Sequence, residues 1–159
     1  MRILGLDYGT KRVGVAISDE LGLTAQGIAT IAVRNRRQLI GEIERIVRAR
    51  TVEAIVLGYP LRLDNSEGIQ CEKVKSFARS LSMRLSVPVV LHDETLTTKD
   101  AEEILRNGGI RGKRRKEAVD KLAAALILQS YLDAARRRDH AVSPRPTSPH
   151  EDSAFTQEQ

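Results

Sequence analysis

The sequence predicts an α/β fold in which a mixed five-stranded sheet, three antiparallel strands and then two parallel crossover strands, carries helices on both faces. Three segments of strand character, at 2–8, 12–18 and 23–33, follow one another with short links, as in an antiparallel meander. Segments with helical spacing then alternate with two short, continuously apolar segments, which is typical of strands covered on both faces. The predicted order is β-β-β-α-β-α-β-α-α, which indicates a single mixed sheet.

The first strand ends at an acid that is followed by a glycine turn. Apolar residues at 3–6 lead to Asp7, and Gly9 lets the chain turn sharply into the second strand. An ionised carboxylate beside a hydrophobic strand is costly unless a positive group pairs with it, either a metal ion or Lys11 and Arg12. Such a turn can also bring a phosphate close to backbone N–H groups. The same residues fit a tight hairpin in which Asp7 only caps the turn.

The middle of the chain alternates helices and buried strands. A helix is expected at about 36–50, because its apolar residues recur at helical spacing. A strand at 54–58 follows, then a loop at 59–65. A second helix is expected from Ser66, as its N-cap, to about residue 85.

The next predicted strand, at 87–91, runs into His92, Asp93 and Glu94. A third helix begins after Thr97 or Thr98, where Thr97 and Asp100 could form a capping arrangement, and it stops at Gly108 and Gly109. A long last helix is expected at about 115–137.

Residues 1–137 are predicted to form one domain, and the Pro- and Ser-rich residues 138–159 to be a disordered tail. Truncation after Arg138 is therefore expected to leave folding intact. Thermal unfolding of the full and shortened chains tests this, and a substantial loss of thermal stability would contradict it.

Composition excludes several classes of protein. No apolar stretch reaches the ~20 residues of a membrane span, and the apolar run near the start is too short for a signal peptide. Cys71 is the only cysteine, so it can form no intrachain disulfide, and it is interpreted as a helix residue without a reactive role. The expected location is the cytoplasm.

The predicted domain is basic. Residues 1–137 hold 24 Lys and Arg residues against 17 Asp and Glu residues. Basic residues cluster at 34–37, 111–116 and 136–138, which suits a polyanion, although each cluster alone could be a solvated helix face or end. The sequence has no Trp, three Tyr and two Phe. Any nucleic acid would therefore be held mainly by its backbone and little by base stacking.

Three acids are expected to converge. Asp7 ends the first strand, Glu94 lies just past the last, and Asp120 lies in the first turns of a helix whose following residues are almost all apolar. Ligands bind at strand ends in such sheets, and carboxylates suit Mg²⁺ or Mn²⁺. Taken alone, Asp120 could be an acid that the helix dipole favours near a helix N-terminus and that has no role in a site. Asp93 should point the other way from Glu94, and His92 is expected to pack or hydrogen-bond, since no His or Cys cluster has zinc spacing.

Four motifs carry a resemblance. The segments GLDYGTKRVGVAISD at 5–19, VLGYPLRLDNSEG at 56–68, HDETLTT at 92–98 and VDKLAAALILQSYLD at 119–133 resemble the YqgF/RuvX family. That family has the ribonuclease H-like fold; its members are described as Holliday junction resolvases and are associated with trimming the 5′ end of pre-16S rRNA. The resemblance implies catalytic and metal-binding roles for Asp7, Glu94 and Asp120. The substrate-binding residues expected from the motifs and the basic cluster are Gly9, Thr10, Lys11, Arg12, Thr97, Thr98, Lys113, Arg114, Arg115 and Lys116.

Three departures from the family pattern matter. Thr95 stands where Arg usually follows the acid, which removes one expected positive contact near the phosphate. Tyr59 and Arg62 replace a common Leu and Asn, which could alter how their loop meets substrate. Ala residues follow Asp120, where related nucleases often carry a fourth carboxylate, so the number of metals stays open.

The leading hypothesis is a nuclease dependent on Mg²⁺ or Mn²⁺ that acts on structured RNA in ribosome maturation. A junction resolvase acting on branched DNA would need paired active sites, and the sequence does not determine whether the protein is a monomer or a homodimer. A non-catalytic nucleic-acid-binding module is the second rival. The segment from Asp7 to Thr10 also resembles the phosphate loop of sugar-kinase-type ATPases, but those proteins need two large lobes.

Overall fold

The computed structural model describes residues 1–60, 68–94, 97–109 and 111–142, with the backbone alone at 94, 97–100, 102, 141 and 142. Its strands are β1 (Arg2–Tyr8), β2 (Arg12–Ser18), β3 (Ala25–Ala32), β4 (Val52–Pro60) and β5 (Val89–Glu94). Its helices are α1 (Arg36–Ala49), α2 (Ile69–Arg84), α3 (Thr97–Asn107) and α4 (Lys113–Val142). The strands form one sheet in the order β3-β2-β1-β4-β5.

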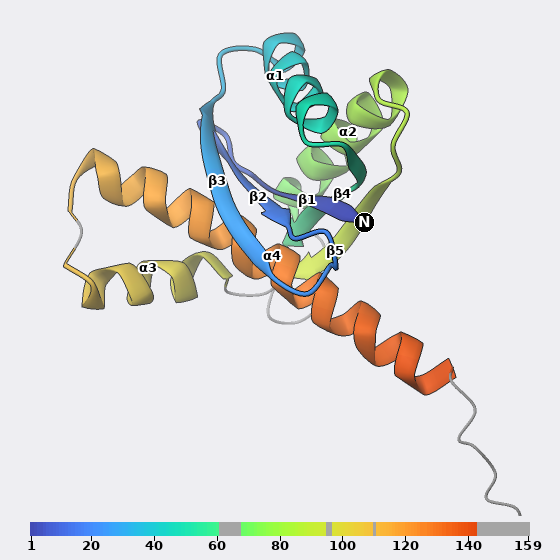
Figure 1. The fold of residues 1–159 in the computed structure, drawn as a ribbon. Coiled ribbons are helices and arrows are strands. Elements are labelled where there is room, and N and C mark those ends of the chain that lie inside the picture. The colour runs from blue at the N-terminus through green and yellow to red at the C-terminus, as the bar shows by residue number, and fades with distance from the viewer. Residues whose placement is uncertain (61–67, 95–96, 110, 143–159) are drawn as a thin grey trace, which may run out of the picture.

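The strands of the sheet run in the predicted mixture of parallel and antiparallel directions. Strand β2 pairs antiparallel with both β1 and β3, whereas β4 pairs parallel with both β1 and β5. Helices α1 and α2 cover one face of the sheet, and α4 crosses the other, with α3 packed along the N-terminal half of α4 (Figure 1). The predicted fold class is confirmed.

Strand alternation divides β1 between two cores. Leu4 and Leu6 join the larger core, beneath α1 and α2, which also holds the fully buried Phe77. Ile3 packs on the other face with Leu128 of α4. Asp7 shares the parity of Ile3 and therefore lies on the α4 side of the sheet.

Glycines let α4 lie directly against the sheet. A Cβ placed on Gly14 of β2 would lie 1.9 Å from the backbone oxygen of Asp120. Cβ atoms on Gly5 and Gly27 would lie 2.7 Å from Leu128 Cβ and 2.8 Å from the Lys121 oxygen. A side chain at any of these positions would push the helix away, so this close packing depends on glycine in three neighbouring strands.

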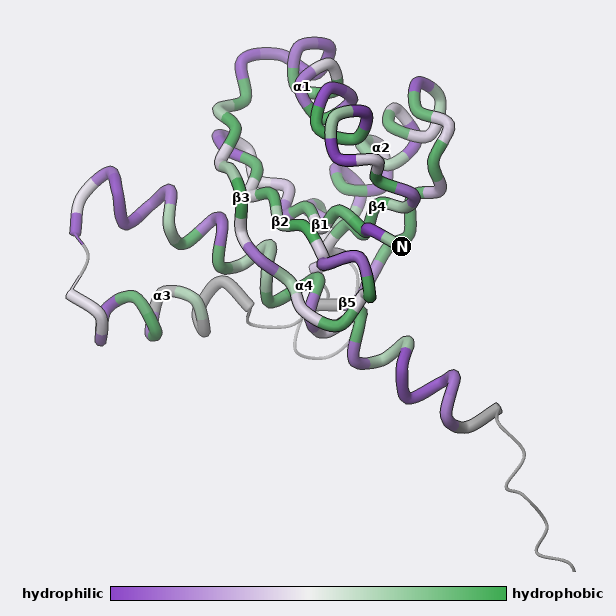
Figure 2. Tube along the Cα trace, viewed as in Figure 1, coloured by the Kyte–Doolittle hydropathy of each residue, from purple (hydrophilic) through white to green (hydrophobic). Residues whose placement is uncertain are grey.

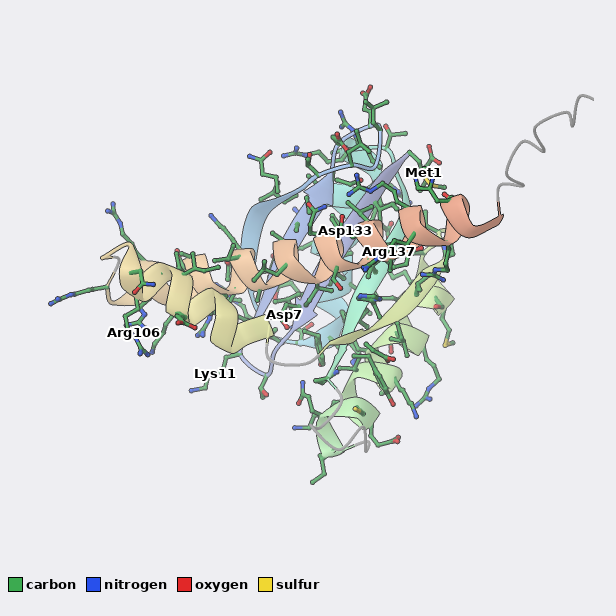
Figure 3. The ribbon with its side chains drawn as sticks, turned by 90° about the horizontal axis from the view of Figure 1, so that it is seen from below. Met1, Asp7, Lys11, Arg106, Asp133 and Arg137 are labelled. Atoms are coloured by element: carbon green, nitrogen blue, oxygen red, sulfur yellow. The ribbon has the colours of Figure 1, made fainter. Side chains whose placement is uncertain are left out.

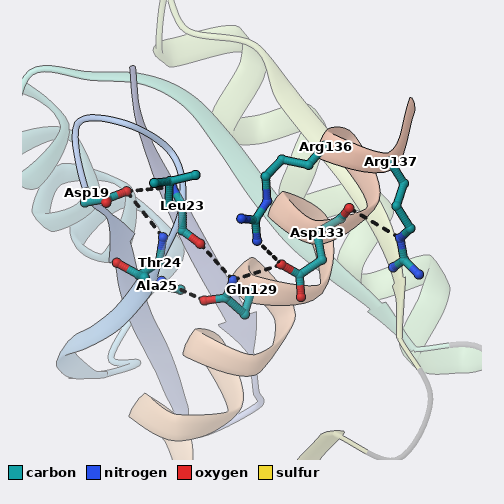
Figure 4. Close-up of polar contacts among 8 residues, drawn as sticks. All are labelled: Asp19, Leu23, Thr24, Ala25, Gln129, Asp133, Arg136 and Arg137. Carbon is teal, nitrogen blue, oxygen red and sulfur yellow. Dashed lines mark hydrogen bonds and ion pairs between the residues drawn. The ribbon is translucent and has the colours of Figure 1, made fainter. Parts of the chain in front are cut away.

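A polar clamp fixes the C-terminal half of α4 to the β2–β3 connection. Gln129 Oε1 accepts a hydrogen bond from Ala25 N at 3.0 Å, while Gln129 Nε2 donates to Leu23 O at 2.9 Å and to Asp133 Oδ1 at 3.1 Å (Figure 4). The hydrogen bond from Gln129, and after it the one from Arg136, hold the pKa of Asp133 below its usual value. The clamp sets the lengthwise position of α4 on the sheet.

Several predicted boundaries shift. Strand β4 continues through Tyr59 and Pro60, which the sequence placed in a loop, because β4 and β5 keep pairing from Gly58↔His92 to Pro60↔Glu94. The same pairing carries β5 past its predicted end at residue 91. Helix α2 begins at Ile69 with Gly68 as N-cap, rather than at Ser66, which lies outside the described residues.

The last helix also differs from its predicted limits. It begins at Lys113 and continues to Val142, so the basic cluster lies within its first turn and residues 138–142 are helical. The rest of the predicted tail, 143–159, lies outside the described residues. As predicted, α3 stops at Gly108 and Gly109, where Gly109 has a φ of +75°. Among the helices the structure describes, none has the length and apolar character needed to span a membrane.

Candidate active site

Asp7 lies at the end of β1 beneath α4. Its backbone pairs with Gly14 of β2, the residue on which the Asp120 backbone rests. Figure 3 shows α4 crossing the sheet, with Asp7 labelled beside it and Lys11 farther out at the turn. The missing side chain of Gly14 therefore brings together two of the three predicted acids.

The two acids interact electrostatically. Burial, and then the negative charge of Asp120, raise the pKa of Asp7 from 3.8 to about 6. Within the part of the chain that the structure describes, the Asp7 carboxylate has neither a hydrogen-bond donor nor an ion-pair partner. A mostly buried carboxylate without a donor, next to a second carboxylate, is an arrangement that a cation would stabilise.

Arg12 contacts Asp120 directly. Its Nε donates to Asp120 Oδ2 at 2.6 Å, and the Asp120 side chain is only 17% exposed. This ion pair joins the start of β2 to α4. The sequence predicts Arg12 as a partner of either Asp7 or phosphate, whereas in the structure it pairs with Asp120.

A groove opens beside this ion pair. It has a volume of about 810 Å³ and is lined by Arg12, Gly112, Lys113, Arg115, Lys116, Val119 and Asp120. Of the seven lining residues in the part of the chain that the structure describes, four are basic. The basic cluster and the acid that follows it in the last helix thus line one concave surface. Arg114 is exposed but is not one of the lining residues.

The β1–β2 turn is tight. Gly9 N donates to Arg12 O at 3.0 Å, and a Cβ on Gly9 would lie 2.6 Å from that oxygen. Thr10 and Lys11 are exposed at its tip. The glycine requirement that the sequence indicated therefore arises from a close backbone approach within the turn.

Glu94 is placed by its backbone. Strands β1, β4 and β5 are parallel. The β1–β4 pairing extends to Leu6↔Leu57, and the β4–β5 pairing extends to Pro60↔Glu94. Glu94 therefore ends β5 at the same edge of the sheet at which Asp7 ends β1. The side chain of Glu94 lies outside what is described, as does Thr95. Thr97 and Thr98 begin α3, again with the backbone alone. Among the described side chains, no group of three His, Cys, Asp or Glu residues is arranged to hold a metal.

The structure also tests the predictions for His92 and Cys71. His92 Nε2 lies 2.9 Å from Ser130 Oγ, and its ring packs edge-on against Tyr131, as predicted for a structural histidine. Burial lowers the pKa of His92; nearby Asp93 opposes this shift. Cys71 is buried in α2, with its thiol 3.1 Å from Pro60 O.

Tyr59 does not lie in a substrate-facing loop. It belongs to β4, is buried in the core under α1 and α2, and has Lys75 Nζ 5.7 Å from its ring centroid. Its departure from the family pattern is therefore a change in the core. Arg62, the other departure in that motif, lies outside the described residues.

One residue that shapes the site is not among those predicted from the sequence. Gly14 is predicted only to belong to the second strand, although it determines how closely Asp120 approaches Asp7. A glycine inside a strand signals a bulge or a close approach by another backbone, so the signal was present. What approaches it could not be known before the sheet and α4 were placed together.

Comparison with known proteins shows which family the chain resembles. The RuvX family, described as "Holliday junction resolvase", matches residues 1–134. A protein of Syntrophus aciditrophicus (strain SB), named "Putative pre-16S rRNA nuclease", is 61% identical over 134 residues, covering 84% of this chain and 89% of that protein. A protein of the same name from Agathobacter rectalis is 48% identical over 136 residues, covering 84% of this chain and 95% of that one.

Solved structures show the same fold. A T. thermophilus RuvC in complex with a Holliday junction substrate aligns with a TM-score of 0.53 at 18% identity, covering 86% of this chain and 96% of that one. The fowlpox virus Holliday junction resolvase aligns with a TM-score of 0.51 at 16% identity, covering 84% and 99%. The sheet order and these neighbours establish a ribonuclease H-like fold. On its sequence match and relatives, the chain belongs to the RuvX family.

Proposed function

We propose that this protein is a metal-dependent nuclease that hydrolyses phosphodiester bonds in structured RNA and processes the 5′ end of pre-16S rRNA in the cytoplasm. The observation that carries the proposal is the proximity of the Asp7 and Asp120 carboxylates at the edge of a basic groove. The name of the 61% identical relative supports rRNA as the substrate. We assign this activity to residues 1–137.

The residues present fit a hard divalent cation. Asp7, Glu94 and Asp120 would hold Mg²⁺ or Mn²⁺, since carboxylate oxygens are the ligands these ions prefer. When bound, such an ion would activate the attacking water and stabilise the leaving oxygen of the phosphodiester. The raised pKa of Asp7 supports the same assignment, because a cation beside it would restore its ionised form.

The remaining residues would orient the substrate. Arg12 holds Asp120 in place through their ion pair. Lys113, Arg115 and Lys116 line the groove without a salt bridge to any described residue, so their charges are available to backbone phosphates. Contacts of this kind position a nucleic acid without reading its bases. The proposed substrate-binding set is completed by Arg114 of the same basic cluster, by Gly9, Thr10 and Lys11 at the turn, and by Thr97 and Thr98 at the start of α3.

Cleavage assays test the proposal. A labelled precursor of the small-subunit rRNA 5′ end and a four-way DNA junction are each incubated with the protein and Mg²⁺ or Mn²⁺. We expect cleavage of the RNA. Paired symmetric cuts in the junction alone would support the resolvase that the family description names. Binding without cleavage under any condition would contradict catalysis and favour a binding module.

Glu94→Gln is expected to reduce cleavage by at least about a hundredfold, because it removes a proposed metal ligand and leaves size and shape nearly unchanged. The matched control is Asp93→Asn, at the adjacent, exposed acid of β5. The rate of RNA cleavage at saturating metal is the measurement. Equal losses in the two variants, or a loss only in Asp93→Asn, would contradict the assignment of Glu94.

A further inference from the structure

The basic surface around the candidate site continues around the edge of the sheet toward the α1 face. Val33 N donates to Lys11 O at 2.9 Å, and Arg12 pairs with Ala32 at the end of β3. These contacts fix the connection from β3 to α1 beside the β1–β2 turn. We call the exposed cations Lys11, Arg34, Arg36 and Arg37 the basic band.

The band differs from other basic residues of α1 and α2. Arg48 and Arg84 both pair with Glu44, at 2.9 Å each. None of the four band residues forms a salt bridge within the described part of the chain. Arg36 Nη1 instead donates to Ser76 Oγ at 3.0 Å and to Ser80 Oγ at 3.3 Å, so its guanidinium lies at the junction of α1 and α2 with its charge uncompensated.

These charges oppose helix stability. Helix α1 starts with Arg36 and Arg37 and has no acid in its first turn, and α4 likewise starts with basic residues and no acid. Cations near a helix N-terminus are unfavourable because the positive end of the helix dipole lies there. Figure 2 shows hydrophilic residues over both helix starts. Two such starts flanking one sheet edge indicate that a polyanion compensates the charge.

The aromatic residues that the structure describes leave little role for base stacking at the band. Tyr8 and Phe77 stack on each other with ring centroids 4.3 Å apart, Tyr59 is buried, and Tyr131 packs on His92. The partner of the band is therefore expected to be recognised through phosphates. Helices α1 and α4 lie on opposite faces of the sheet, so a nucleic acid that reaches both helix starts has to extend around the sheet edge over several base pairs.

We infer that the basic band binds backbone phosphates of the RNA that flanks the cleavage position, so that the substrate extends from the groove around the sheet edge to α1. This inference rests on the proposed function and specifies its substrate: an RNA whose backbone continues several base pairs beyond the reacting phosphate. Recognition at the band is independent of base sequence.

The test uses Arg34→Gln/Arg37→Gln. The matched control, Arg45→Gln/Arg50→Gln, removes the same charge from two exposed arginines of the middle and far end of α1. Binding is measured in EDTA, which prevents metal-dependent cleavage, with RNA hairpins whose stems have about 6 and about 20 base pairs. For the long hairpin, the band variant should weaken binding by about tenfold and lower the slope of log K against log salt by about 1 to 2.

Both variants should bind the short hairpin as the wild type does, and the control should also bind the long hairpin normally. The thermal midpoint of the band variant should be unchanged or raised. Equal binding of the long hairpin by band variant and control would overturn the inference, as would a loss confined to the short hairpin. A band effect in a protein that cleaves no RNA would uphold the band and refute the proposed function alone.

Discussion

Gly14→Ala is expected to destabilise the protein by about 3 kcal/mol or more. This is the largest loss of stability that we expect from adding a single methyl group. The added Cβ would lie 1.9 Å from the backbone oxygen of Asp120 and 3.2 Å from its Cα. A backbone atom cannot escape by changing rotamer, so α4 as a whole would have to move away from β2. Urea unfolding followed by circular dichroism measures the loss through the transition midpoint at constant m-value.

Gly41→Ala provides the matched control. Gly41 lies within α1, where a Cβ would meet only Arg84 Nη2, at 3.7 Å. Alanine is the better helix former, so this variant should gain about 0.5 to 1 kcal/mol. A stability for Gly14→Ala close to that of the wild type would show that α4 does not rest on β2 as described.

Asp7→Asn is expected to abolish RNA cleavage while making the metal-free protein more stable. The folded-state pKa of Asp7 is raised from 3.8 to about 6, so the folded chain binds this proton more tightly than the unfolded chain does. The stability that the protonated form contributes is full below about pH 4 and is lost as the pH rises through 6. Asparagine carries no charge, and at pH 8 without metal the variant should therefore gain on the order of 2 to 3 kcal/mol.

Unfolding in EDTA at pH 4 and pH 8 measures this gain, which should be present at pH 8 and nearly absent at pH 4. Adding Mg²⁺ or Mn²⁺ should raise the thermal midpoint of the wild type but not of Asp7→Asn, because only the wild type retains the ligand. Asp93→Asn, at an exposed acid, is the control and should change stability by less than about 0.5 kcal/mol. A variant that is less stable than the wild type at pH 8 would contradict the unpaired, buried state of Asp7.

Local patterns in the sequence predicted most of the fold. The first two strands lie where alternation and apolar runs placed them, and α1 and α3 begin and end within a residue or two of the predictions. The errors in β4 and β5 arise because pairing with a neighbour extends each strand, whereas α2 begins later than predicted and α4 extends further at both ends. β4 gains Tyr59 and Pro60, and β5 gains His92 to Glu94, because each strand continues the hydrogen bonds of the other. Such pairing is a property of two segments and leaves no signal in either one alone.

For the site, the sequence by itself determined the types and order of the candidate residues: an acid ending the first strand, a second acid in a buried helix and a basic cluster before it. These are properties of residue type and of local period, which tertiary contacts do not alter. Only the tertiary structure decided that Gly14 brings Asp120 close to Asp7, that Arg12 pairs with Asp120, and that the end of β3 carries the arginines of α1 to the turn. Each of these joins segments distant along the chain, and their separation in space depends on how closely a helix can pack on a sheet.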